Sequence, residues 1–139
     1  MRLEPLVPGA LPVRAPLLKV RRPISFWGGI DPSTGAIIDA RHPDRGTRIG
    51  GAILALPGTI GSSSSSSVLL ELVRVGAAPA AILMVEVDAI LLLGLLVARE
   101  MGWPAPPAYR CDGADMARLT AGCYLIDGDA RLEREGDHG

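Results

Sequence analysis

The chain has 139 residues, with 14 basic and 15 acidic side chains that leave a formal net charge of −1 at pH 7. This length allows one domain with a buried core. The balanced charge and the 4% aromatic content argue against a nucleic-acid-binding surface. Cys111 and Cys123 form neither a close metal-binding pair nor a disulfide framework, so reduced thiols in a cytoplasmic protein are expected.

Two segments raise the question of targeting. Residues 1–17 contain four prolines, which break any continuous apolar core, so the segment is expected to be an extended proline-rich arm and not a signal peptide. Residues 77–98 are apolar and long, but Pro79, Glu86 and Asp88 interrupt them. Since carboxylates are costly within a bilayer, a strand followed by a buried helix is expected there, with no membrane partner.

The main folded unit is expected at 18–132 and begins with β structure. Residues 19–26 predict one or two short strands. Two further strands should follow, joined by a hairpin-like turn at 31–35, because aspartate, proline and glycine stand at typical turn positions. The glycine pair at 28–29 fits a close backbone approach or a β-bulge equally well. His42 is a catalytic candidate, although a surface-loop histidine is the commoner case.

The middle of the chain predicts alternating strands and helices. Residues 48–56 read as a strand, and a helix should cover about 66–75. The nearly all-apolar run 80–87 predicts a central strand. Asp88 is a good N-cap for a helix over about 89–101. Because this helix is apolar nearly all round, it should be deeply buried or covered by a second subunit.

The last third predicts short strands and turns. Strands are expected at 108–111, 117–120, 123–126 and 130–132, with a tight turn at 127–129. The charged residues 133–139 are expected to be a frayed tail. Altogether the pattern predicts an α/β domain with a mixed sheet and about two helices.

The candidate site is the loop before the first helix. Gly58 and Gly61 precede six consecutive serines at 62–67. A helix N-terminus with free N–H groups and hydroxyls suits a carboxylate or a phosphate. A flexible serine linker is an alternative, and helix capping explains one serine but not six. No Gly-Lys-Ser/Thr follows the glycines, so the loop is not a nucleotide P-loop.

Three stretches resemble signatures of the small, swivelling-domain subunit of aconitase X: residues 24–39 with His42 and Pro43, residues 54–72, and residues 123–129. The resemblance covers about residues 18–132. It implies the swivelling β/β/α domain of aconitases and hydro-lyase chemistry in an active site shared with a large subunit. It also implies that an iron–sulfur cluster is held by the large subunit's cysteines, with no cofactor bound by this chain alone.

The resemblance also implies roles for the loop residues. Ser62 is expected to be the proton acceptor, or alternatively only a hydrogen-bonding ligand of the substrate. Gly61 allows the backbone to turn, and Ser63 and Ser64 are expected to orient the substrate carboxylate. The serines at 65–67 are expected to cap the helix.

Two branches of the family differ in substrate. One dehydrates cis-3-hydroxy-L-proline to Δ1-pyrroline-2-carboxylate, and the other dehydrates mevalonate 5-phosphate. Thr59 and Ile60 stand where the family's loops often have glycine and arginine. The missing arginine and the low basic charge near the loop favour a small carboxylate, and therefore hydroxyproline.

Two other classes of function compete with the dehydratase. A phosphohistidine carrier needs a histidine in or just after the loop, but His42 and His138 lie in other segments. A non-catalytic lid or scaffold subunit remains an alternative.

Overall fold

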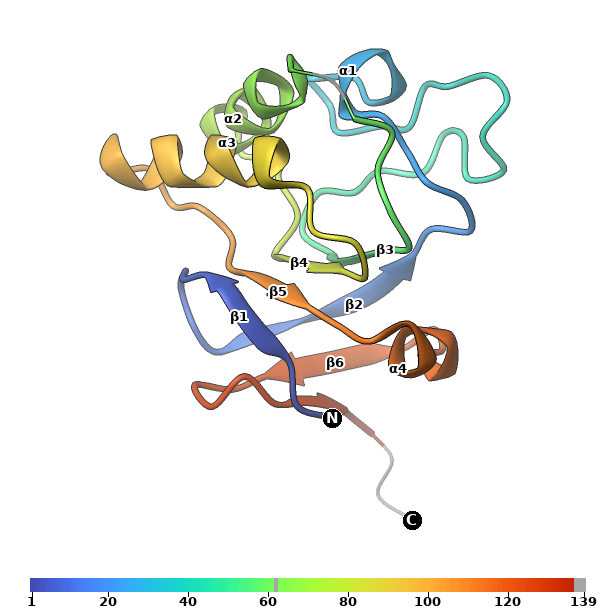
Figure 1. Ribbon diagram of the computed structural model, residues 1–139, viewed down its shortest axis with the longest axis vertical. Coiled ribbons are helices and arrows are strands. Elements are labelled where there is room, and N and C mark those ends of the chain that lie inside the picture. The colour runs from blue at the N-terminus through green and yellow to red at the C-terminus, as the bar shows by residue number, and fades with distance from the viewer. Residues whose placement is uncertain (62, 137–139) are drawn as a thin grey trace.

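The computed structural model describes residues 1–61 and 63–136. Within them the chain forms seven strands and four helices (Figure 1). In chain order their bounds are β1 Glu4–Val7, β2 Val13–Lys19, α1 Phe26–Gly29, β3 Ile53–Leu56, α2 Ser65–Val75, β4 Ala81–Met84, α3 Ala89–Glu100, β5 Ala108–Arg110, α4 Gly113–Arg118, β6 Cys123–Ile126 and β7 Leu132–Arg134.

The strands form one mixed sheet in the order β1-β5-β4-β3-β2-β6-β7. The four strands β2 to β5 run parallel at its centre, while β1, β6 and β7 pair antiparallel to their neighbours. The sheet curls until its two edges meet. Leu3 donates its N–H to the carbonyl of Ala130 at 2.8 Å, and Leu132 donates to the carbonyl of Met1 at 2.8 Å. Closure of this kind leaves few unpaired edge groups.

The strands β3 and β4 bury both of their faces. In β3, Ile53 and Ala55 belong to the core inside the curled sheet, whereas Leu54 and Leu56 belong to the core beneath the helices. All four side chains are fully buried. The alternation has the period of two expected of a strand, and burial on both sides explains why the sequence of β3 is continuously apolar.

The helices α1, α2 and α3 lie together over one side of the sheet, and α4 lies apart beside β6 (Figure 1). The predicted long helices are confirmed to within about a residue at each end, and Asp88 caps α3 by accepting the N–H of Leu91 at 3.0 Å. Gly76 ends α2 in the left-handed region at φ 77°. A Cβ on Gly94 would lie 2.6 Å from the carbonyl oxygen of Ser66, so glycine permits the close approach of α3 to α2.

The N-terminal segment differs from the expected arm, because most of it belongs to the sheet. β1 pairs with β5, and β2 lies between β3 and β6. In β2, Val13, Ala15 and Leu17 are buried while Arg14 and Pro16 are exposed. This alternation of period two is the signal that the prolines obscured.

The frayed tail expected from residue 133 onward is wrong for its first residues, because Glu133 and Arg134 belong to β7 and pair with β6. Two further expectations about secondary structure are also wrong. Residues 117–120 do not form a strand, because α4 occupies Gly113–Arg118 and buries Met116 in the core of the curled sheet. Alanine, methionine and arginine favour a helix over a strand. Residues 19–26 do not form regular strands either: β2 ends at Lys19, and Ile24 makes only an isolated bridge.

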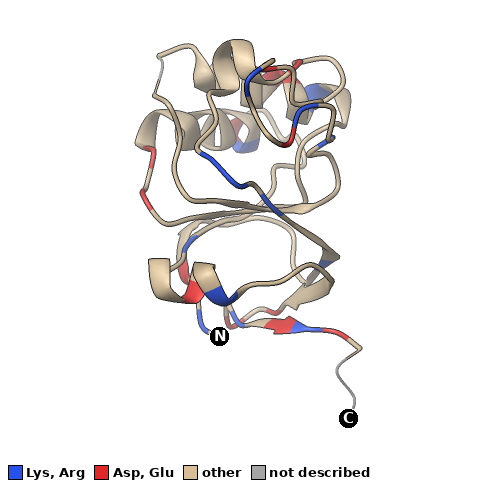
Figure 2. Cartoon of the chain, turned by 90° about the vertical axis from the view of Figure 1, so that its right-hand side faces the viewer, with Lys and Arg blue, Asp and Glu red and all other residues tan. Residues whose placement is uncertain are grey.

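Charged residues of both signs are interspersed over the face shown in Figure 2. Among the described residues, no helix combines the length and apolar character needed to cross a bilayer.

Candidate functional site

The glycine-serine loop lies at the carboxyl end of β3 and leads into α2. The neighbouring parallel strand β4 likewise leads from its carboxyl end towards α3. The N-terminal ends of α2 and α3 therefore lie at the same end of the sheet. In open α/β sheets this is the end where ligands bind, because N–H groups and helix dipoles converge there.

The start of the loop is held from two sides. Thr59 forms a parallel bridge with Ile24, and the N–H of Ile60 donates to the Ile24 carbonyl at 3.1 Å. On the other side the Thr59 hydroxyl donates to Oδ2 of Asp88 at 2.6 Å, while Oδ1 of the same carboxylate caps α3. One carboxylate thus ties the loop to the N-terminus of α3.

Of the predicted site residues, Ser62 lies outside the described residues, so its role stays a prediction. Gly61 and Ser63 are exposed, and Ser64 is half-buried. Ser64 takes the N-cap position of α2, and its carbonyl accepts the N–H of Ser67 at 3.1 Å. The structure therefore places the predicted substrate contacts on the open side of the loop.

The expectation that residues 65–67 cap the helix is wrong, because Ser65 is already the first residue of α2. Ser65 is only 1% exposed, and its hydroxyl has no hydrogen-bond partner among the described residues. It faces away from solvent, unlike Ser63. Among the described serines, Ser63 therefore lies exposed in the loop, whereas Ser65 to Ser67 belong to α2.

The described surroundings of the loop include two carboxylates. A Cβ on Gly58 would lie 3.4 Å from Oε2 of Glu86, and Asp88 bonds to Thr59. Glu86 is exposed. Negative charge at this position disfavours a dianionic ligand more than a monoanionic one.

His42 has a structural role and not a catalytic one, because its ring is buried and both ring nitrogens contact backbone groups. It is 6% exposed, its Nε2 lies 3.1 Å from the Arg22 carbonyl, and its Nδ1 accepts the N–H of Asp44 at 3.0 Å. With the backbone engaging both ring nitrogens, neither is available to a substrate.

Asp44, beside that histidine, has a lowered pKa. Burial raises its pKa, but this is outweighed by the hydrogen bonds and charge of Arg21, with a smaller contribution from His42. Arg21 donates its N–H to Oδ2 at 2.9 Å and its Nε to Oδ1 at 3.0 Å. The group fixes the long connection between β2 and β3.

The hairpin-like turn at 31–35 is confirmed, but it lies away from the serine loop. Asp31 accepts the N–H of Ser33 at 2.8 Å, and Ile30 pairs with Ile37. A Cβ on Gly35 would lie 2.9 Å from the carbonyl of Ala77, just beyond the C-terminal end of α2. This turn is therefore a packing element at the opposite end of that helix.

The glycine pair 28–29 lies in α1 and forms neither of the two arrangements considered. Gly28 has φ +81°, and nothing lies within 4 Å of the Cβ position there. The positive φ of this kink explains the glycine.

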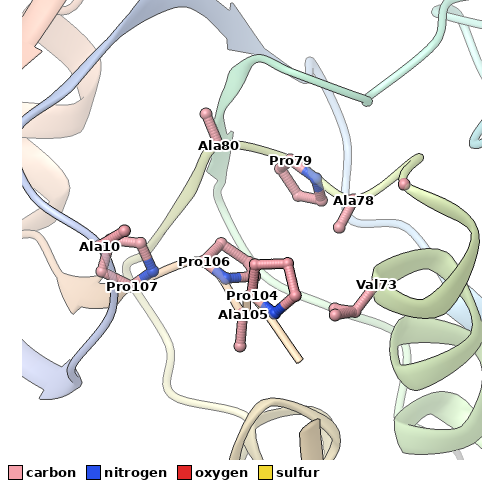
Figure 3. A pocket seen from close by; sticks show the side chains of 10 residues that line it. Ala10, Val73, Ala78, Pro79, Ala80, Pro104, Ala105, Pro106 and Pro107 are labelled. Carbon is pink, nitrogen blue, oxygen red and sulfur yellow. The ribbon is translucent and has the colours of Figure 1, made fainter. Parts of the chain in front are cut away.

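A cavity of about 240 Å³ lies near the C-terminal end of α2, as Figure 3 shows. Its labelled side chains are those of alanine, valine and proline. They offer no acid, base or nucleophile, so this cavity is no catalytic site.

The described residues do not fit an iron–sulfur cluster. Cys111 is buried, whereas Cys123 is exposed on β6. Burial, together with the charges of Asp115 and Asp112, raises the pKa of the Cys111 thiol to about 11, which disfavours the thiolate that a metal needs. Across residues 1–61 and 63–136, no three His, Cys, Asp or Glu side chains gather as a possible metal site.

Comparison with known proteins identifies the family. A family model described as the aconitase X swivel domain matches residues 1–132. The chain belongs to the aconitase X swivel domain family. The match includes β1 and β2, in agreement with their place in the sheet.

The solved structure of Thermococcus kodakaraensis aconitase X, in its holo-form, superposes with a TM-score of 0.78 at 30% identity, covering 95% of this chain and 96% of that one. The predicted fold, the swivelling β/β/α domain, is thereby confirmed. It has two long helices, as expected, and the short α1 and α4 in addition.

Two relatives illustrate the names found in the family. A cis-3-hydroxy-L-proline dehydratase of Pseudomonas aeruginosa is 47% identical over 115 residues, which are 82% of this chain and 20% of that protein. A phosphomevalonate dehydratase small subunit of Methanopyrus kandleri is 40% identical over 97 residues, 70% of this chain and 72% of that one. The chain thus spans about a fifth of the length of the first relative.

Sequence reasoning identified the loop and the Asp88 cap but missed the clamp on Thr59. Its two partners, Ile24 and Asp88, are distant in sequence, and only the fold brings them together. The one available signal was Thr59 itself, a hydroxyl between the two glycines of the loop.

Proposed function

We propose that this chain is the small subunit of an aconitase X-type dehydratase and that it acts in a site shared with a larger polypeptide. The observation that carries the proposal is the family match over residues 1–132, combined with an anchored, open glycine-serine loop at the ligand-binding end of the sheet. The relatives named above are dehydratases.

The substrate that we propose is cis-3-hydroxy-L-proline. The Pseudomonas aeruginosa relative that carries this activity in its name is 47% identical. The acidic surroundings of the loop, with Glu86 and Asp88, suit a single carboxylate better than a phosphate dianion. Mevalonate 5-phosphate is the second candidate, because the Methanopyrus kandleri relative, a small subunit of which this chain covers 72%, is named for its dehydration.

In the proposed reaction the Ser62 oxygen removes the proton from Cα of the substrate. The C–H electron pair forms the new double bond, and hydroxide leaves from the neighbouring carbon. A serine hydroxyl is a weak base, so its pKa must be lowered by its surroundings. The N-terminal end of α2 favours the alkoxide form of Ser62, which becomes a neutral hydroxyl as it accepts the proton. Gly61 and the hydrogen bond between Thr59 and Asp88 position the backbone that leads to Ser62. Ser63 and Ser64 orient the carboxylate of the substrate.

The iron–sulfur cluster that the family implies belongs in this proposal to the large subunit. The positive charge that balances the substrate carboxylate also comes from the large subunit, since Glu86 and Asp88 flank the loop.

Co-expression with the large subunit, followed by assays for loss of cis-3-hydroxy-L-proline and of mevalonate 5-phosphate, tests the function. Turnover of the proline alone supports the proposed substrate. Turnover of the phosphate alone reverses the substrate assignment but keeps the family function. Activity of the isolated small chain would contradict a shared site.

The role of Ser62 is tested in the same complex with Ser62→Ala and, as a matched control, Ser67→Ala. Loss of a proton acceptor is expected to lower kcat by about a hundredfold or more, while the exposed helical Ser67 tolerates the change. Appreciable turnover by Ser62→Ala would instead favour the lid or scaffold alternative.

A further inference from the structure

The helix α3 carries a second apolar face that the described chain leaves uncovered. Its buried face packs on α2 and the sheet through residues such as Leu91 and Leu95. The uncovered face, called here the α3 strip, consists of six apolar side chains that are each between 42 and 53% exposed: Val87, Ile90, Leu93, Leu96, Val97 and Met101. An apolar row of this size on the surface is typical of a protein interface.

The α3 strip begins beside the candidate site. Asp88, between Val87 and Ile90, holds the hydroxyl of Thr59 at 2.6 Å. The next loop residue, Ile60, is 56% exposed. The bond between Thr59 and Asp88 therefore places the exposed loop next to the start of the α3 strip, so a polypeptide that covers the exposed Gly61 and Ser63 also meets this helix.

We propose that the α3 strip, together with Ile60, is the docking surface for the larger polypeptide. This inference rests on the proposed function. The occupant is indicated by the Pseudomonas aeruginosa relative, of which this chain matches only 20% of the length. Most of that relative is polypeptide outside the region that this chain matches. An exposed apolar row that starts beside the serine loop is the surface that such a polypeptide would bury.

The test compares Leu93→Glu/Val97→Glu with Val75→Glu. Val97 is 42% and Val75 40% exposed, so the control places the same residue change at equal exposure. Val75 lies nine positions after Ser66, which faces α3 at Gly94. At 3.6 residues per turn, Val75 therefore points away from α3. Circular dichroism melts of the isolated chains establish whether each variant folds. If the double variant does not fold, the milder Leu93→Gln replaces it in the binding measurement.

The measurement is the affinity of each purified small chain for the tagged large subunit. Two carboxylates buried in the interface without partners are expected to weaken binding by at least about a hundredfold, with the affinity of Val75→Glu unchanged. Wild-type affinity and turnover in the folded double variant would overturn the docking surface and leave the proposed function standing. Failure of the wild-type chain to bind the large subunit would overturn both.

A second copy of this chain is the competing occupant. If light scattering shows the isolated wild-type chain to be a dimer that Leu93→Glu/Val97→Glu converts to a monomer, the strip belongs to that dimer and the proposal is wrong. A monomeric wild-type chain agrees with it.

Discussion

At the scale of single residues, one carboxylate performs two tasks. Oδ1 of Asp88 caps α3 and Oδ2 accepts the hydroxyl of Thr59. Hydrogen bonds to charged groups contribute about 1.5–3 kcal/mol each. The cap was evident from sequence, since aspartate before an apolar run is a common helix start. The bond to Thr59 was not, because no local pattern pairs residues on separate elements.

Thr59→Val tests whether this bond positions the serine loop. Valine keeps the shape of threonine but loses the hydroxyl, so the loop should shift relative to α3. We expect kcat of the assembled enzyme to fall about tenfold, which corresponds to about 1.4 kcal/mol, with KM little changed. Thr59→Ser should restore kcat. Equal kcat values for the valine and wild-type enzymes would show that the bond only stabilises the fold.

Asp44 gives the chain a specific response to acid. Its pKa is lowered in the folded state, so its carboxylate stabilises the fold above the ordinary aspartate pKa, and this contribution is lost as the pH falls through the lowered value. Asp44→Asn should reduce the free energy of unfolding by about 1–2 kcal/mol at pH 7, with a difference that shrinks towards pH 3. Urea unfolding at several pH values measures it. A difference independent of pH would refute an ionic origin.

At the scale of the elements, the contact of α2 with α3 depends on one missing side chain. Gly94→Ala would gain about 1 kcal/mol in helix propensity, but the added Cβ would lie 2.6 Å from the Ser66 carbonyl. We expect net destabilisation of about 1–3 kcal/mol. Gly113→Ala on α4 is the control, because its Cβ would meet only Val85 Cγ1 at 3.7 Å. If Gly94→Ala raised the melting temperature, α3 would be free to move away from α2.

The accuracy of sequence-based prediction also varies with the element. The sequence predicted β3, β4, α2 and α3 because each contains a clear apolar pattern. In addition, Gly76 marks the end of α2 and Asp88 marks the start of α3. The short α4 was missed, since six residues show less than two helical turns of pattern. For α3 the sequence left two options open, a deeply buried helix and a helix covered by a second subunit. Periodicity cannot distinguish them, because an apolar face looks the same in the sequence whether this chain or a partner covers it.

At the scale of the whole molecule, the N-terminal strand seals the curled sheet. Leu3 is 3% exposed and lies in the core inside the sheet. An arm outside the domain would have left it in water. The prolines of this segment suggested an extended arm and obscured the alternating side chains of β2. Pairing between the two ends of a chain also leaves no local pattern in the sequence, so the closure of the sheet could not be predicted.

Leu3→Ala and Leu11→Ala measure how far this seal matters. Leu11 is 39% exposed between β1 and β2, so the pair applies one chemical change to a buried and to an exposed site. Leu3→Ala should reduce the free energy of unfolding by about 2–4 kcal/mol, and Leu11→Ala by less than about 1 kcal/mol. Urea denaturation gives both values, and equal small losses would mean that the closure of the sheet by residues 1–3 adds little to the stability of the domain.

The junction of Met1 with Leu132 brings the two ends of the folded domain side by side, at the pole away from α1, α2 and α3 (Figure 1). A linker attached at either end would leave from nearly the same point, far from the loop between β3 and α2. Such a domain could therefore be joined to a larger polypeptide through either end, or be made as a separate chain, without a change in its fold. The same geometry suits it to circular permutation, because a short bridge could join the old ends without disturbing the loop between β3 and α2.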